Sequence, residues 1–109
     1  MKALDPGKLD KQIIVQRLSE TNLRGELMNV WSTLTTVWAE VLSRGSREVW
    51  RAQQAMGELE YLVRIRRYDG LTTKDRVSWG SRTLEVIGVQ ETEIGTSQYT
   101  ELYCKEMGV

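Results

Sequence analysis

The sequence predicts a mainly β protein: a small antiparallel barrel or sandwich of about six strands with one inserted helix. Three observations support this fold class. Short runs rich in β-branched residues alternate between apolar and polar positions, as half-buried strands do. Gly, Asn, Asp and Ser separate these runs at short spacing. A single stretch in the middle of the chain has helical periodicity instead.

Two strands are expected before the helix. Gln12–Leu18 is rich in β-branched residues, and Thr21–Gly25 follows it as a turn. Leu34–Val41 alternates, with Val37, Ala39 and Val41 on one face and Thr36, Trp38 and Glu40 on the other. We expect the segment between them, near Leu23 to Trp31, to be a loop.

The predicted helix covers approximately residues 47–59. Val49, Ala52, Met56 and Leu59 recur at steps of three and four residues, which places them on one stripe. Ser46 is suited to cap the first turn, and Glu48 is favourably placed near the positive end of the helix dipole.

Further strands follow the helix. Glu60–Tyr68 alternates along its length, and Asp69-Gly70 then forms a turn. Arg76–Trp79 and Arg82–Glu93 are separated by the tight turn Gly80-Ser81. A last strand covers Tyr99–Glu106, with Leu102 and Cys104 facing the same way.

Composition limits the classes of protein that this chain can belong to. Its 109 residues correspond to one domain, 1–109, with residues 1–9 as a loose N-terminal lead-in. The 15 basic residues are balanced by 15 acidic ones, whereas proteins that grip nucleic acid carry a cationic surplus. Neither a signal peptide nor a membrane span is expected, because no apolar stretch is long enough.

The residue types needed for common catalytic sites are missing. The chain has no histidine, so the commonest general base and metal ligand are absent. Cys104, the single cysteine, suits a small buried position in a strand better than a nucleophile, because it has no histidine partner. The scattered carboxylates are typical of a solvated surface. We therefore expect no enzymatic activity, no metal and no cofactor.

Aromatic and basic residues are the remaining candidates for a functional surface. Trp31, Trp38 and Trp50 would either pack in the core or anchor an interface, where tryptophan is enriched. Arg64, Arg66 and Arg67, followed by Tyr68, form the most basic patch. Such a patch is compatible with a solvated strand face, with a partner-binding surface, or with an OB-like barrel that binds single-stranded nucleic acid.

Several motifs along the chain resemble the head-tail joining (head-closure) family of long-tailed bacteriophages. They occur in the family's order from about Asp10 to Glu106, nearly the whole chain. The motifs are Val37-Trp38-Ala39-Glu40-Val41, a helix with Glu48 and Ala52, Val63-Arg64-Ile65-Arg66, Asp69-Gly70-Leu71-Thr72, Asp75-Arg76-Val77, Glu85-Val86-Ile87-Gly88-Val89 and Leu102-Tyr103-Cys104-Lys105-Glu106.

The resemblance implies a structural virion protein with a small β-barrel. Such a protein closes the DNA-filled capsid beneath the portal or adaptor and offers a docking platform to the tail. The expected partners are the connector proteins and the tail terminator. The resemblance further implies a dodecameric ring. We also expect a monomer when free, assembly in the bacterial cytoplasm, DNA that passes through a channel without sequence-specific binding, and no contact with a membrane.

The family carries no catalytic residues to transfer. Its arginines match Arg64, Arg66 and Arg76. Together with the tryptophans proposed above, they make up the candidate interface: Trp31, Trp38, Trp50, Arg64, Arg66 and Arg76. Tail completion is a second role that the resemblance leaves open.

Overall fold

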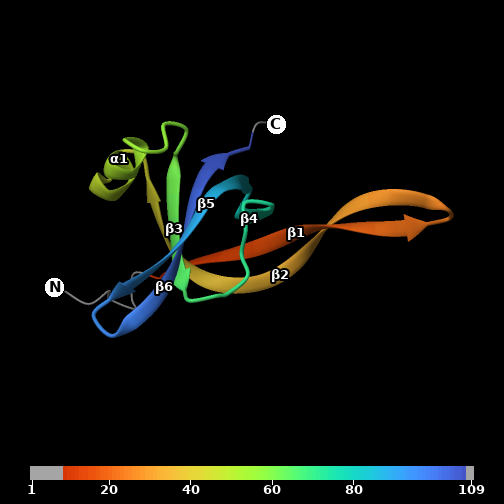
Figure 1. The fold of residues 1–109 in the computed structure, drawn as a ribbon, viewed down its shortest axis with the longest axis horizontal. Helices are drawn as coiled ribbons and strands as arrows, with labels where there is room; N and C mark the ends of the chain where they lie inside the picture. The colour runs from red at the N-terminus through yellow and green to blue at the C-terminus, as the bar shows by residue number, and fades with distance from the viewer. Residues whose placement is uncertain (1–8, 108–109) are drawn as a thin grey trace.

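The computed structural model describes residues 9–107 as a closed antiparallel barrel (Figure 1). The strand order around the barrel is β1-β2-β3-β6-β5-β4, and one short helix lies between β2 and β3. The predicted class, a small barrel with one inserted helix, is thus confirmed. The elements are β1 (Lys11–Leu23), β2 (Glu26–Ser43), α1 (Arg47–Gln53), β3 (Tyr61–Arg66), β4 (Asp75–Trp79), β5 (Arg82–Ile94) and β6 (Ser97–Glu106).

Two pairings between distant parts of the chain close the barrel. β4 pairs with β1, where Val15 lies opposite Val77. β6 lies between β3 and β5, so that Leu102 faces both Val63 and Val89 in the ladders. Closure removes the unpaired edges from the body of the barrel, which an open sheet would have to protect.

The inward-facing positions of all six strands, together with Leu71 from the segment between β3 and β4, form the main core. The two-residue alternation in the sequence produces this core, because every second side chain of a strand points to the same face. Cys104 and Leu102 are both fully buried there, which confirms the structural interpretation of the cysteine. The buried members are Ile13, Val15, Ala39, Val63, Ile65, Leu71, Val77, Leu84, Val86, Leu102 and Cys104.

The first two strands continue beyond the barrel as a long two-stranded hairpin (Figure 1). Residues 18–23 of β1 pair only with residues 26–31 of β2, because the β4 ladder ends at Arg17 and the β3 ladder begins at Ala39. We call this hairpin, residues 18–31, the arm. It gives the molecule a length of 55 Å against 28 and 23 Å in the other directions.

The expected loop near Leu23 to Trp31 is therefore wrong. The turn contains only Arg24 and Gly25, both with positive φ (54° and 82°), and β2 begins directly after it at Glu26. Two successive residues with positive φ are characteristic of the tight turn that matches the twist of a hairpin. Gly25 adopts its positive φ without steric strain, so the turn needs only two residues and both strands pair right up to it.

The helix begins where predicted but is shorter than residues 47–59. Ser46 caps it by accepting a hydrogen bond from the Val49 amide at 3.2 Å. After Gln53 the chain turns, and the Gln53 side chain donates to the Leu59 carbonyl at 2.7 Å, which ties the end of the helix to the following loop. The apolar stripe still points inward: Val49 and Leu59 are buried with Leu62 in a second, smaller core.

The predicted lead-in, residues 1–9, lies outside the described residues except for Leu9. That side chain is buried, with 8% of its surface exposed. Within residues 9–107, no helix is long and apolar enough to cross a membrane.

Candidate assembly interface

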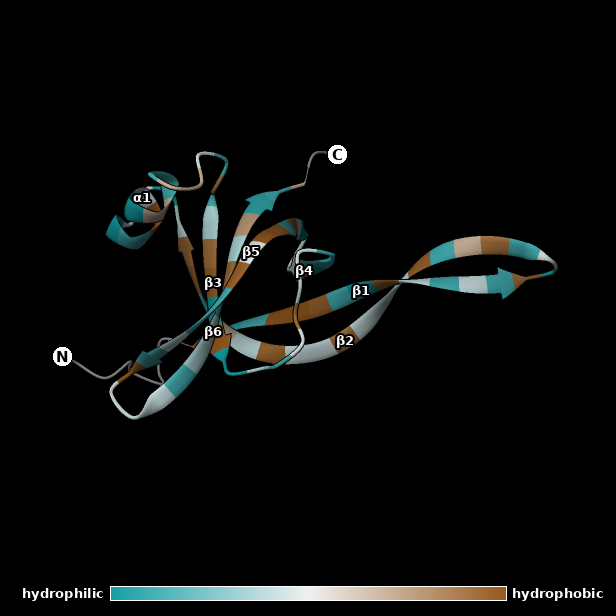
Figure 2. Cartoon of the chain, in the orientation of Figure 1, coloured by the Kyte–Doolittle hydropathy of each residue, from teal (hydrophilic) through white to brown (hydrophobic). Residues whose placement is uncertain are grey.

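The arm presents most of the apolar surface that the barrel leaves uncovered. Five of the eight large hydrophobic side chains exposed among the described residues lie on it. Figure 2 shows hydrophobic segments recurring along the arm, far from the core. These side chains are Leu18, Leu23, Leu27, Met28 and Val30, and Leu27 is the most exposed at 73%.

Trp31 and Arg76 meet on one face of the arm where it leaves the barrel. The Arg76 guanidinium lies 4.0 Å from the centre of the Trp31 ring, a cation–π contact. Arg76 also donates from Nε to the Gln16 side-chain oxygen at 2.7 Å. The structure thus brings together two of the predicted interface residues, and both support the root of the arm.

An ion pair fixes the root on the opposite face. Arg17 donates from Nε and Nη2 to the two carboxylate oxygens of Asp75, at 2.8 and 2.9 Å, and from Nη2 to the Gly70 carbonyl at 2.7 Å. The Thr72 amide donates to the same carboxylate at 2.9 Å. Burial alone would raise the pKa of Asp75, but the hydrogen bonds from Arg17 and Thr72 outweigh it and lower that pKa.

Arg64 lies on the outer face of the barrel, between two carboxylates from neighbouring strands. It pairs with Glu40 of β2 at 2.8 Å and with Glu101 of β6 at 2.7 Å. The register places all three residues in one row across β2, β3 and β6. Only 11–12% of each side chain is exposed, so this predicted interface residue mainly joins three strands.

Trp38 and Arg66 occupy the same outer face and are open to solvent. They follow the Ala39–Ile65 pair at the end of the β2–β3 ladder, which places them at neighbouring positions. Trp38 is 57% exposed, and Arg66 makes no ion pair with any described residue. We call these two residues, with Gln12 opposite Trp38 on β1, the Trp38 face.

Trp50 is a separate exposed aromatic residue. It projects from α1 with 61% of its surface exposed, while Val49 beside it is fully buried. The arm and α1 lie at opposite ends of the long axis (Figure 1). The six predicted residues therefore divide into the root of the arm, the Trp38 face with Arg64, and the helix.

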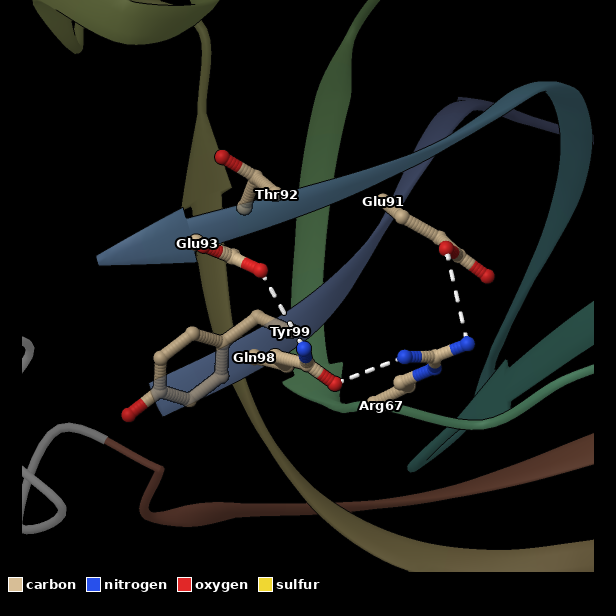
Figure 3. Close-up of a pocket in the computed structure, with 6 residues that line it drawn as sticks. All are labelled: Arg67, Glu91, Thr92, Glu93, Gln98 and Tyr99. Atoms are coloured by element: carbon tan, nitrogen blue, oxygen red, sulfur yellow. Dashed lines mark hydrogen bonds and ion pairs between the residues drawn. The ribbon is translucent and has the colours of Figure 1, made fainter. Parts of the chain in front are cut away.

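A shallow pocket between β5 and β6 contains polar groups that satisfy one another (Figure 3). Arg67 donates to the Gln98 side-chain oxygen at 2.7 Å and lies 4.0 Å from Glu91, while Gln98 donates to Glu93 at 3.1 Å.

Burial raises the pKa of the Cys104 thiol to about 12, so this thiol is not an activated nucleophile. No cluster of three or more potential metal ligands occurs among residues 9–107.

Comparison with known proteins identifies the family of this chain. The family described as phage head completion protein matches residues 4–107. The chain belongs to this family. The resemblance to a head-closure family is thereby confirmed. This head completion protein has a structural role in closing the phage head.

A solved structure shows the same fold. The solution structure of protein SF1141 from Shigella flexneri 2a has 25% sequence identity and a TM-score of 0.71, and the match covers 94% of this chain and 96% of that one. No curated protein matches the head completion protein.

Family membership assigns the head completion protein to the virion, where it interacts with portal and tail components. The family is structural rather than enzymatic. The role in assembly agrees with the exposed apolar surface of the arm.

Sequence reasoning missed the arm, although a pattern that predicts it was present. Gly25 lies between Leu23 and the run Leu27, Met28, Val30, and a short break that contains Gly between apolar runs is compatible with a hairpin. Asn22 and Gly25 led instead to the interpretation as a turn and loop.

Proposed function

We propose that this head completion protein acts as a ring, dodecameric as in the family it resembles, that closes the DNA-filled capsid beneath the portal or adaptor and forms the platform on which the tail docks. In this proposal the free chain is a monomer, and the ring is built on the connector during assembly in the host cytoplasm. DNA passes through its channel without sequence-specific contacts.

The arm is the observation that carries the proposal. A closed barrel with a satisfied core has no need of an exposed apolar hairpin for its own stability, and exposed apolar patches commonly mark interaction sites. Arg17, Arg64 and Arg67 pair with carboxylates of the same chain. These arginines are therefore not free to bind phosphate, which favours a protein-binding role over a nucleic-acid-binding one. A chain of zero net charge suits a channel through which DNA must move freely.

Deletion of the gene tests the role directly. Negative-stain electron microscopy of the lysate is expected to show heads that have lost DNA beside separate, complete tails, and supplying the wild-type gene in trans should restore joined particles. DNA-filled heads beside incomplete tails would assign the protein to tail completion instead. Normal tailed particles would refute both roles.

An OB-like barrel that binds single-stranded nucleic acid is the competing proposal. It requires affinity for single strands that falls steeply with salt, because bound cations replace counterions on phosphate. Fluorescence anisotropy with a labelled oligonucleotide at low and high salt distinguishes the two, and the ring proposal expects no binding at either salt concentration.

A further inference from the structure

We propose that the arm of one copy packs across the Trp38 face of the next copy in the ring. This inference rests on the proposed ring and names the surfaces that build it. The arm is the surface that reaches out, and the Trp38 face of the neighbouring barrel is the surface that receives it.

The free arm lacks what normally stabilises strands. An isolated two-stranded hairpin is only marginally stable in water, and a third strand or a packing partner is usually needed. All residues from Leu18 to Val30 are exposed, and neither strand has an outer neighbour beyond the barrel. Unpaired edges together with apolar side chains favour contact with another protein.

Both faces of the arm carry apolar side chains. Leu23, Met28 and Val30 share one face, where Thr21 and Ser19 lie opposite the last two. Leu18 and Leu27 point to the other face with Trp31. A two-sided apolar surface fits a partner that the arm lies across and partly inserts into.

The charge of the arm argues for protein and against DNA as this partner. Residues 18–31 contain the two carboxylates Glu20 and Glu26 and one cation, Arg24. A surface that contacts phosphate would need a cationic surplus. The arm has a net negative charge, so the fitting partner offers apolar surface and a free cation.

The Trp38 face offers both. The Trp38 ring is exposed, and Arg66 beside it lacks an ion pair among the described residues, so it can meet Glu20 or Glu26 of an incoming arm. Tryptophan and arginine are the residue types that dominate interface energetics. The six paired positions of the arm extend about 20 Å at ~3.3 Å per residue, close to the 23 Å thickness of the molecule.

The two surfaces differ and lie far apart on one chain. Met28 and Trp38 are ten positions apart along β2, about 30 Å at the rise of a strand. An arm therefore does not reach the Trp38 face of its own barrel. A contact between two different surfaces is heterologous, and such contacts generate rings when the rotation closes.

Cross-linking in assembled particles tests the contact. We would introduce Met28→Cys on the arm and Gln12→Cys on the Trp38 face, and treat purified virions with a short bismaleimide. The single native cysteine is buried with a pKa of about 12, so it contributes no background. The double variant is expected to give a ladder of covalent oligomers, and each single variant none.

The outcomes separate this inference from the proposed function. Dimers from Met28→Cys alone would mean that arms meet arms, and intact virions without a ladder would mean that the arm contacts another protein; either result overturns the inference while head closure stands. Normal particles from the gene deletion would remove the proposed function itself, and the inference with it.

A matched pair of charge variants gives an independent readout. Met28→Glu places a carboxylate in the proposed interface, whereas Thr96→Glu adds the same charge at the exposed turn before β6. Plaque titre in a complementation assay should fall roughly tenfold or more for Met28→Glu, since a buried unpaired charge is costly. Unchanged titre with both variants would contradict the inference, provided that thermal unfolding shows both barrels folded.

Discussion

The Arg64 guanidinium shows how one side chain can hold three strands together. Its partners come from β2 and β6, on either side of β3, and all three groups are largely shielded from water. A charge-assisted hydrogen bond is stronger than a neutral one, and two bonds to Glu101 fix the orientation of the guanidinium. Its principal task is therefore within the barrel.

Replacing Arg64 by Met should destabilise the barrel by about 3–5 kcal/mol, because Glu40 and Glu101 would remain as largely buried charges without a cation. Urea unfolding followed by tryptophan fluorescence measures this loss. Arg82→Met, which removes an exposed pair with Glu106 at 3.7 Å, an exposed hydrogen bond to the Tyr61 hydroxyl and a contact 5.4 Å from the centre of the Trp79 ring, is the control and should change the free energy of unfolding by less than about 1 kcal/mol. Similar losses in both variants would contradict the structural role of Arg64.

Asp75 makes the free energy of unfolding depend on pH in the acid range. Its pKa is lower in the folded state than in the unfolded chain, so its contribution is fully present above the unfolded value of about 3.9 and is lost as pH falls through the folded pKa. Asp75→Asn should cost about 1.5–3 kcal/mol at pH 7, the usual loss for hydrogen bonds to a charged group. The difference from wild type should shrink between pH 5 and pH 2.

Urea midpoints measured at several pH values test this prediction. Asp69→Asn is the matched control, because that carboxylate is exposed and its pair with Arg67 is open to solvent. A gap between wild type and Asp75→Asn that stays constant from neutral to acid pH would show that the carboxylate charge is not responsible.

At the scale of the element, the barrel provides the stability of the fold and the arm provides an exposed surface. The arm contributes no member of the main core, and its root is held by Trp31 with Arg76 on one face and by Arg17 with Asp75 on the other. It follows that the arm can be shortened without damaging the barrel.

Replacing Glu20–Asn29 by Asn-Gly removes the tip of the arm. The new turn would be closed by Ser19 and Val30, which lie four residues from Leu23 and Glu26 along each strand and so form a pair of the same type. The free energy of unfolding should change by less than about 1 kcal/mol. Phage complementation should fail, and a plaque count near that of wild type would show that the arm is dispensable.

The elements predicted correctly were those with strong local patterns. Period-two alternation fixed the strands after the helix, because each alternates over a length that lies in the barrel. The helix was overextended, since Met56 and Leu59 keep helical spacing while the backbone turns after Gln53. The arm escaped prediction because its apolar residues face water, and alternation between core and solvent gives no guidance there.

The interface residues were only partly predictable, for a related reason. The unusual number of tryptophans in a small chain marked Trp38 and Trp50 as candidates but left open whether they lie in the core or at the surface, and the structure exposes both. The pairing of Arg76 with Trp31, and of Arg64 with two carboxylates, depends on registers between strands that are distant in sequence. Nothing local in the sequence specifies those registers.

At the scale of the whole molecule, assembly should change protection in the regions that carry exposed tryptophan or apolar residues. The arm and the segment from Ser43 to Glu60 are expected to exchange amide hydrogens faster in the free chain than in the virion, because docking buries them. Hydrogen exchange on the purified chain and on assembled particles measures this. β3, inside the barrel, is the internal control, and equal protection of the arm in both states would contradict the prediction.

The strand order also has a consequence for how the chain is made. Because β6 lies between β3 and β5, the barrel cannot close until β6 has been synthesised, whereas pairing within the arm involves only neighbouring residues. Folding of the barrel thus follows synthesis, and its rate is limited by contacts between distant segments. During that interval the nascent chain exposes both its future core and its apolar arm, and such transiently exposed apolar surface makes the incomplete chain prone to aggregation.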